Sequence, residues 1–278
     1  MMRLTHYLLK RKIICMTRNT KLKLSPSRWH VIISHAVNSS AKTIKNGRVK
    51  TTFRTTLAPW GEICIQDYRW NLKKRLISPL RPPRAKKAWK HSLSLIQNHF
   101  PIIEPLLYLE LKNGPFVSRS FTATKWIEST PLSKTAKERH LISDTFFLGL
   151  LQKSAELIAG LHAKGFVHQD LKFGNFLWVP SQQGRIILSD LDHLEKTGAA
   201  QKQGKDLARF ILSALEYDIG WEVAEYLINC YFDSRKVCPP GLEKSLITCI
   251  QRKKTKYKNR HLTKTGMLPS DATLRTKK

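Results

Sequence analysis

Apolar and polar residues alternate along much of the first half of the chain, which is the spacing of a strand with one buried face. Two such stretches, 48–57 and 62–68, are rich in β-branched residues and flank a turn that contains Pro and Gly, so they predict a hairpin. Helical spacing predicts a helix from 84 to about 98, and strands are expected again at 101–110 and 116–127. This half is therefore predicted to be rich in strands.

The second half of the chain changes to helical spacing. From Ser133 onward, apolar residues recur every three or four positions until Gly165, which suits a helix C-cap. Two further helices are predicted, at 206–232 and 241–251. Strands first and helices later indicate an α+β protein with two lobes. We predict four segments: a basic leader expected to be poorly ordered, a β-rich N-lobe, a mainly helical C-lobe and a basic tail, at 1–27, 28–128, 129–251 and 252–278.

Composition agrees with a folded and strongly basic protein. The chain has 278 residues, of which 41% are hydrophobic, enough for a sizeable core. Its formal net charge is +29, which favours anionic partners such as glycans that carry phosphate, anionic lipid or nucleic acid. The five cysteines are odd in number and contain no CxxC pair, so they indicate reduced thiols rather than a disulfide framework.

The chain is expected on the cytoplasmic side of a membrane rather than across it. Its apolar stretches are interrupted by charges well before the roughly 18 residues that a spanning helix needs. The apolar run near the N-terminus, 13–16, is too short for the core of a signal peptide. The basic residues cluster, most clearly at 69–90, where Lys and Arg occur without any Asp or Glu. Because this cluster lies between structured segments, we expect its charge to be displayed in a fixed place.

The most informative segment follows the predicted helix end at Gly165. It contains His168-Gln169-Asp170-Leu171-Lys172, then Asn175 five positions after the Asp, and later a short apolar strand that ends in Asp190. A carboxylate, an amide and a second carboxylate in this order are what phosphoryl transfer requires, because one group orients a hydroxyl while oxygen ligands hold Mg²⁺ on nucleotide phosphates. Each feature alone is common in loops, so the prediction depends on their conjunction.

Each of these residues has a candidate role. Asp170 is the candidate catalytic base, which orients the acceptor hydroxyl and takes its proton. Lys172 can place a positive charge near the transferred phosphoryl group. Asn175 and Asp190 offer oxygen ligands for the metal of a bound nucleotide. Asp192 is a weaker alternative to Asp190.

The segment 168–177, together with Ser189-Asp190-Leu191-Asp192, resembles the protein-kinase-like superfamily, and more narrowly the bacterial lipopolysaccharide core kinases of the heptose and Kdo kinase family. The helix start Arg84-Ala85…Trp89 and the segment 205–209 agree with this resemblance, which covers about residues 45–215. It implies a bilobal protein-kinase-like fold and a kinase that uses ATP and Mg²⁺. It also implies that the substrate is an inner-core sugar of lipopolysaccharide, at the inner face of the bacterial inner membrane.

The chain departs from the kinase pattern in its first half. Where kinases place a strand lysine that holds the α/β-phosphates, the aligned residue is Gln66. Asp67 follows it, and its negative charge is expected to have the wrong sign for a phosphate site. The glutamate expected on the next helix is missing, and Ala88 lies near its place. We therefore retain Gln66 as the candidate residue at the nucleotide site. Another cation would have to replace the strand lysine, and the sequence does not rank the candidates Lys50, Lys73 and Lys74.

Three functions are compared. The first is an ATP-dependent phosphotransferase that acts on a sugar hydroxyl of the lipopolysaccharide inner core, with peripheral contact with an anionic membrane surface. The second is a pseudokinase that binds an anionic glycan or a partner without turnover, motivated by Gln66 and Ala88. The third is a nucleic-acid binder, which we disfavour because the seven Trp residues are scattered in apolar contexts that suit core packing.

Overall fold

The structure is a computed structural model that describes residues 11–17, 25–39, 41–47, 49–58, 60–80, 82–182 and 184–252. The chain divides into two compact units. The first unit comprises Met1–Ser154 and Gly174–Glu195, and the second comprises Ala155–Phe173 and Lys196–Lys278. The predicted leader lies partly outside the described residues, but it contains a strand, Arg11–Thr17. The predicted tail lies outside them from residue 253, and the four predicted segment boundaries remain predictions.

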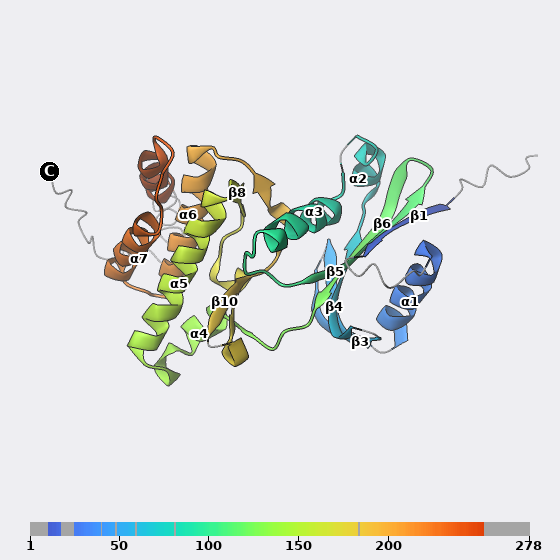
Figure 1. Cartoon of the computed structure of the whole chain (residues 1–278), viewed down its shortest axis with the longest axis horizontal. Coiled ribbons are helices and arrows are strands. Elements are labelled where there is room, and N and C mark those ends of the chain that lie inside the picture. Colours follow the sequence, from blue (N-terminus) through green and yellow to red (C-terminus); the bar gives the residue numbers. More distant parts are fainter. Residues whose placement is uncertain are drawn as a thin grey trace, which may run out of the picture. The chain divides into compact units, whose positions relative to one another are not determined.

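The first unit is built on a six-stranded antiparallel sheet with the strand order β1-β5-β6-β4-β3-β2 (Figure 1). The predicted hairpin is confirmed as β3 and β4, with Lys50 opposite Tyr68 and Thr52 opposite Gln66. The strands are β1 (Arg11–Thr17), β2 (Lys42–Asn46), β3 (Lys50–Leu57), β4 (Gly61–Arg69), β5 (Pro105–Asn113) and β6 (Phe116–Lys125).

Helices cover the two faces of this sheet. Residues that alternate along a strand point to opposite faces, and the two sets make separate cores. One face packs Ile63 and Ile65 of β4 against Trp29 and Ile33 of α1 (Pro26–Ser39). On the other face, Tyr68 packs with the helix α3 (Arg84–Gln97), which confirms the helix predicted there.

The helix α1 was missed by the sequence analysis, although it has a recognisable start. The hydroxyl oxygen of Ser25 accepts a hydrogen bond from the backbone N–H of Arg28 at 3.3 Å, and Pro26 occupies the first helical position. Both are typical N-terminal signals. Trp29, Ile33 and Ala36 follow at helical spacing and are buried. The pattern was concealed because Pro26 and the neighbouring serines were interpreted as the end of a disordered leader.

Shorter elements extend the first unit. The helix α3 contacts the 3-10 turn η4 (Leu191–His193), which follows the strand β10 (Arg185–Leu188). The remaining elements of the unit are α2 (Leu72–Ile77), β7 (Thr130–Pro131), α4 (Leu132–Lys137), η1 (Arg139–Leu141), β9 (Phe176–Val179) and η3 (Pro180–Gln182). The helix α5 (Asp144–Ala163), the turn η2 (Phe173–Asn175) and β11 (Glu195–Lys196) contribute residues to both units.

The second unit is mainly helical, as predicted. After α5, Gly165 has φ +73°, a conformation that glycine adopts without a Cβ clash, and a two-residue strand β8 (Phe166–Val167) follows. The next helices are α6 (Ala200–Leu215), α7 (Trp221–Asp233) and a helix over 242–252. The first of these begins six residues before the predicted start. Within the described residues, no helix is both long and apolar enough to cross a bilayer.

Candidate active site

The segment that carries the predicted base is held by a buried carboxylate of the second unit. Asp206 of α6 is 2% exposed and accepts hydrogen bonds from the backbone N–H groups of His168 at 2.6 Å and Gln169 at 2.7 Å. Gln169 has φ +66°, which is uncommon for a residue with a side chain. Hydrogen bonds to an ionised carboxylate are among the strong ones. Asp206 therefore fixes the backbone immediately before Asp170 in a conformation that it would not readily adopt alone.

A buried histidine completes the support of Asp206. His162 Nε2 lies 3.3 Å from the Asp206 carboxylate, and Nδ1 lies 2.8 Å from the hydroxyl of Tyr231. Burial lowers the pKa of His162, although hydrogen bonding and attraction to Asp206 oppose that shift. A neutral ring that donates from Nε2 to the carboxylate and accepts from the tyrosine at Nδ1 satisfies all of these contacts.

The two predicted catalytic residues lie together. The ammonium of Lys172 is 2.7 Å from the Asp170 carboxylate, and Nε of Arg209 in α6 is 4.0 Å from the other carboxylate oxygen. Asp170 and Lys172 are about one-third exposed, so solvent and a substrate can reach both. Arg209 was not recognised as a candidate because sequence spacing does not indicate which helix residues face the loop.

In the first unit, the two predicted metal ligands are neighbours at one end of the small sheet that contains β9 and β10. The backbone carbonyl of Asn175 accepts hydrogen bonds from Ser189, from its N–H at 2.9 Å and from its hydroxyl at 3.0 Å. Ser189 directly precedes Asp190, which has φ +58°. Aspartate tolerates this left-handed conformation better than most residues. The strand end therefore brings the Asp190 backbone beside that of Asn175.

One of the three unranked lysines reaches Asp190. Lys50, at the start of β3, places its ammonium 2.7 Å from Asp190 and 2.7 Å from Asp192. The same nitrogen lies 3.5 Å from the amide oxygen of Gln66 on the neighbouring strand. Burial alone would lower the pKa of Lys50, but the two carboxylates outweigh burial and raise it. The ammonium is therefore firmly charged. Among the described residues, none forms an ion pair with Lys73. The side chain of Lys74 is not among those that the structure describes.

Tyr68 contacts two of the side chains that surround the Lys50 ammonium. Its hydroxyl is within hydrogen-bonding distance of Gln66, at 2.8 Å, and of Asp192. Because Gln66 and Tyr68 are two residues apart on β4, both point to the sheet face that Lys50 reaches. Burial first, and then the Asp192 charge, raise the pKa of Tyr68 well above its ordinary value. Tyr68 therefore remains a neutral donor.

Asp67 does not oppose this positive group, which corrects the expectation drawn from the sequence. Strand alternation directs its side chain to the opposite face from Gln66. There Asp67 is buried and forms a two-pronged ion pair with Arg119 of β6, at 2.9 Å and 2.6 Å. Its charge is therefore compensated locally, and the concern that it adds the wrong sign beside Gln66 was mistaken.

The candidate metal ligands that the structure brings together are few. No group of three or more His, Cys, Asp or Glu side chains able to hold a metal occurs among the described residues. Mg²⁺ is commonly bound by one or two carboxylates together with phosphates and waters. Asp190 and Asp192, each 2.7 Å from one ammonium, are a carboxylate pair of this kind.

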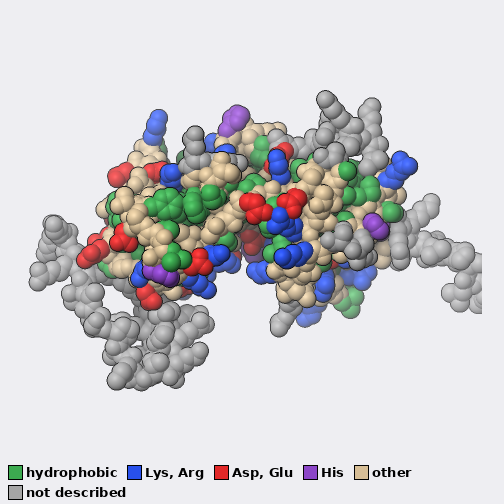
Figure 2. Space-filling view, turned by 90° about the horizontal axis from the view of Figure 1, so that it is seen from below, with side chains coloured by type: hydrophobic (Ala, Val, Ile, Leu, Met, Phe, Trp, Pro, Cys, Tyr) green, Lys and Arg blue, Asp and Glu red, His purple; other side chains and the backbone are tan. Residues whose placement is uncertain are grey.

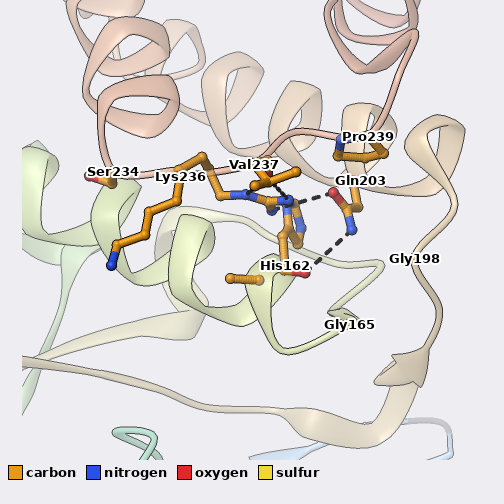
Figure 3. A pocket seen from close by; sticks show the side chains of 10 residues that line it. His162, Gly165, Gly198, Gln203, Ser234, Lys236, Val237 and Pro239 are labelled. Carbon is orange, nitrogen blue, oxygen red and sulfur yellow. Dashed lines mark hydrogen bonds between the residues drawn. The ribbon is translucent and has the colours of Figure 1, made fainter.

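A separate pocket of about 610 Å³ lies in the second unit and contains none of the predicted site residues. Figure 3 shows Gln203 between His162 and the chain segment that follows α7. The guanidinium of Arg235 in this pocket already donates to the carbonyl of Val237 at 3.0 Å and approaches Gln203 at 3.4 Å. Its polar groups are thus engaged in holding the segment after α7, and we assign no ligand to it.

Comparison with known proteins shows that the chain is similar to a protein family and to solved structures. A family model described as the lipopolysaccharide kinase (Kdo/WaaP) family matches residues 66–231. Among solved structures, one described as WaaP in complex with acyl carrier protein is similar, with a TM-score of 0.58 and 17% sequence identity. The match covers 80% of this chain and 91% of that chain. No curated protein matches. The structural likeness confirms the predicted α+β kinase-like fold.

Proposed function

Since this chain belongs to the lipopolysaccharide kinase (Kdo/WaaP) family, we propose that it transfers the γ-phosphate of ATP to a sugar hydroxyl of the lipopolysaccharide inner core. The observation that carries the proposal is the group formed by Lys50, Asp190 and Asp192, in which one ammonium lies 2.7 Å from each of two carboxylates. A cation beside a carboxylate pair supplies groups that a nucleotide triphosphate with its metal requires.

Asn175 and Asp190 are the proposed ligands of Mg²⁺, with Asp192 as an additional oxygen donor. When bound, Mg²⁺ would neutralise part of the charge on the nucleotide phosphates. The chain's own contribution is positional. The hydrogen bonds from Ser189 to the Asn175 carbonyl keep the two ligand-bearing segments in register, so the oxygens need little rearrangement to bind.

Asp170 is the proposed base. Its carboxylate would accept the proton of the sugar hydroxyl as the bond from oxygen to phosphorus forms, which is the role that a loop carboxylate has in kinases. Lys172, 2.7 Å from Asp170, would place its positive charge near the phosphoryl group as that group is transferred. Asp206 acts through the backbone and is a positioning residue.

The proposed partners follow from the acceptor and from the charge. The acceptor would be a lipopolysaccharide core sugar or another anionic glycan, and the net charge of +29 favours contact with an anionic membrane surface. Figure 2 shows Lys and Arg side chains dispersed over the face it draws. We propose a peripheral location at the cytoplasmic face of the membrane that holds the acceptor. Nucleic acid is not favoured as a partner.

The substitution Asp170→Asn tests the proposal. It keeps the size of the side chain and removes the base, so transfer of labelled phosphate from ATP to purified inner-core lipopolysaccharide should fall about 100- to 10,000-fold. The matched control is Asp233→Asn, an exposed position at the end of α7, which should transfer at the rate of the unmodified chain. Undiminished transfer by the Asp170 variant would remove Asp170 from the mechanism.

A pseudokinase that binds without turnover is the alternative, favoured by the single observation that Gln66 occupies the place of the strand lysine. The two functions differ in product rather than in binding. If the chain shows a thermal shift with ATP and Mg²⁺ but yields no phosphorylated acceptor, the pseudokinase is the correct description.

A further inference from the structure

The ammonium of Lys50 lies close to the place that a lysine at position 66 would reach. The nitrogen of a lysine side chain lies two bonds beyond Cδ, whereas the amide oxygen of glutamine lies one bond beyond it. The ammonium of a lysine at position 66 would therefore lie just past the place of the Gln66 oxygen. The ammonium of Lys50 lies 3.5 Å from that oxygen. It reaches this place from the adjacent strand, because Lys50 pairs with Tyr68, two residues after Gln66, in the antiparallel register of β3 and β4.

We propose that Lys50 is the cation that holds the nucleotide phosphates, moved from the usual strand position at Gln66 to the neighbouring strand β3. This proposal rests on the proposed kinase function and names a residue within its site. Gln66 then has a different task. Its oxygen is within reach of both Lys50 and the Tyr68 hydroxyl, so it orients the ammonium rather than binding phosphate itself.

The charges around Lys50 support this assignment. One ammonium lies between two carboxylates, which leaves the group with a net charge of −1. A divalent cation bound to Asp190 would compete directly with Lys50 for that carboxylate. The ammonium would then be released toward the phosphates that the same metal binds, while Asp192 and Gln66 still limit where it can move. Lysine suits such an exchange because it acts as a point charge on a flexible stem.

Nucleotide affinity tests the proposal without using activity. Fluorescence anisotropy of a labelled ATP analogue with Mg²⁺ should show that Lys50→Ala weakens binding about 10- to 100-fold, the range expected for one charged hydrogen-bonding group. The double variant Lys50→Ala with Gln66→Lys should recover much of this loss, because it restores an ammonium from β4. The control Lys45→Ala, on the exposed strand β2, should bind as tightly as the unmodified chain.

Lysine labelling of the unmodified chain provides a second measurement if Lys50→Ala fails to fold. Acetic anhydride should modify Lys50 less in the presence of ATP and Mg²⁺ than in their absence, while Lys45 should be modified equally in both. Equal affinity of Lys50→Ala and the unmodified chain, or unchanged labelling of Lys50 when nucleotide is bound, would overturn the role of Lys50 alone. If the unmodified chain binds no nucleotide, the proposed function itself fails.

A second, independent observation concerns α2. Four apolar side chains project from this helix and the turn after it: Leu72 is 70% exposed, Leu76 58%, Ile77 46% and Leu80 87%. Leu72 and Leu76 are four residues apart in α2 and so share one side of the helix, and Leu80 follows in the turn. We call these four residues the α2 ridge. An exposed apolar set of this kind indicates an interaction surface.

The α2 ridge is displayed by a fixed support. Ser78, which is buried, accepts a hydrogen bond from the backbone N–H of Val117 in β6 at 2.8 Å and donates to the carbonyl of Arg75 at 2.6 Å. The helix α2 therefore lies against β6 (Figure 1), while its leucines remain exposed. These contacts fix the helix that carries the ridge.

Charge complementarity identifies the occupant. The ridge lies within the segment 69–90, where all nine charged residues are Lys or Arg. Among the described residues, no ion pair neutralises Arg69, Lys73 or Arg84. Leucines flanked by cations are the composition of segments that bind in the interface of an anionic bilayer. We infer that the α2 ridge inserts into an anionic membrane surface, with the surrounding cations contacting lipid headgroups.

Sedimentation of the full chain with vesicles tests this inference. Binding to vesicles that contain phosphatidylglycerol should fall about tenfold or more in the variant Leu72→Ser with Leu76→Ser, given the apolar area withdrawn from insertion. The control Leu141→Ser, equally exposed at 70% in η1, should bind normally. Vesicles of phosphatidylcholine alone should bind weakly. Hydrogen exchange at residues 72–80 should slow on anionic vesicles. This readout is local to the ridge, so it does not depend on how much the basic termini contribute to vesicle binding.

Two results would overturn the membrane role of the α2 ridge. One is vesicle binding by the leucine variant equal to that of the unmodified chain, with no protection of residues 72–80. The other is a chain that binds RNA and in which Lys73→Glu weakens both RNA binding and vesicle binding, while the leucine variant changes neither. That result would assign the segment to nucleic acid. Phosphate transfer to a delipidated core sugar should be the same in the leucine variant and the unmodified chain, so this test is separate from that of the kinase function.

Discussion

At the scale of single residues, the register of β3 against β4 places the ammonium of Lys50 beside Gln66 and Asp190. The residue types Asp170, Asn175 and Asp190 and their order could be recognised from the sequence, because phosphoryl transfer restricts which groups are useful. Lys50 could not be selected from its rivals, because the sequence does not specify that it pairs with Tyr68. Alternation along the predicted strand directs Asp67 to the opposite face from Gln66, but the sequence does not identify Arg119 as its partner there.

A pH dependence of stability also belongs to this scale. Burial lowers the pKa of His162 in the folded state, so the unfolded chain takes up a proton at that position more readily than the folded one. Stability from this residue is fully present above the unfolded pKa, about 6.5. It is lost as the pH falls below that value toward the folded pKa.

Urea unfolding at a series of pH values measures this dependence. The unmodified chain should lose stability as the pH falls below about 6.5, and His162→Gln, although less stable, should lose less over the same interval. The charged and polar groups that face His162 are Asp206, Tyr231 and Arg235. An identical slope in the two proteins would show that His162 does not titrate on unfolding.

At the scale of elements, alternation and helical spacing predicted the β3–β4 hairpin, α3 and the long helix that ends before Gly165. They failed for β1 and α1, because a basic composition was taken as evidence of disorder. The start of α6 was also misplaced. Gly204 lies in the second turn of this helix, where its lack of a side chain allows close packing.

Packing around Gly204 decides whether an alanine there raises or lowers the free energy of unfolding. A Cβ added there would lie 2.8 Å from the backbone nitrogen of Leu246 and from the side chain of Ser245. Alanine normally stabilises a helix interior by about 0.5–1 kcal/mol relative to glycine. Here the clash should prevail, and Gly204→Ala should lower the free energy of unfolding by about 1–3 kcal/mol.

The matched control is Gly149 in α5, where an added Cβ meets nothing within 4 Å. Gly149→Ala should stabilise the chain by up to about 1 kcal/mol. Urea denaturation of both variants gives the comparison directly. Stabilisation by Gly204→Ala would mean that α6 and the helix over 242–252 are not as closely packed as the structure has them.

At the scale of the whole molecule, the family and fold class could be anticipated, because both depend on the order of segments more than on exact contacts. The network behind the catalytic loop could not. His162, Asp206 and Tyr231 are 44 and 25 residues apart along the chain, and no local pattern marks them as partners. The strong positive charge was evident from composition, but the α2 ridge required knowledge of which leucines are exposed.

The central claim is that this chain is an active kinase although Gln66 replaces the strand lysine. The most direct measurement is mass spectrometry of purified inner-core lipopolysaccharide after incubation with the unmodified chain, ATP and Mg²⁺. We predict a new phosphoester on a core sugar that requires both ATP and Mg²⁺. An unchanged acceptor, from folded protein that binds the nucleotide, would contradict the claim.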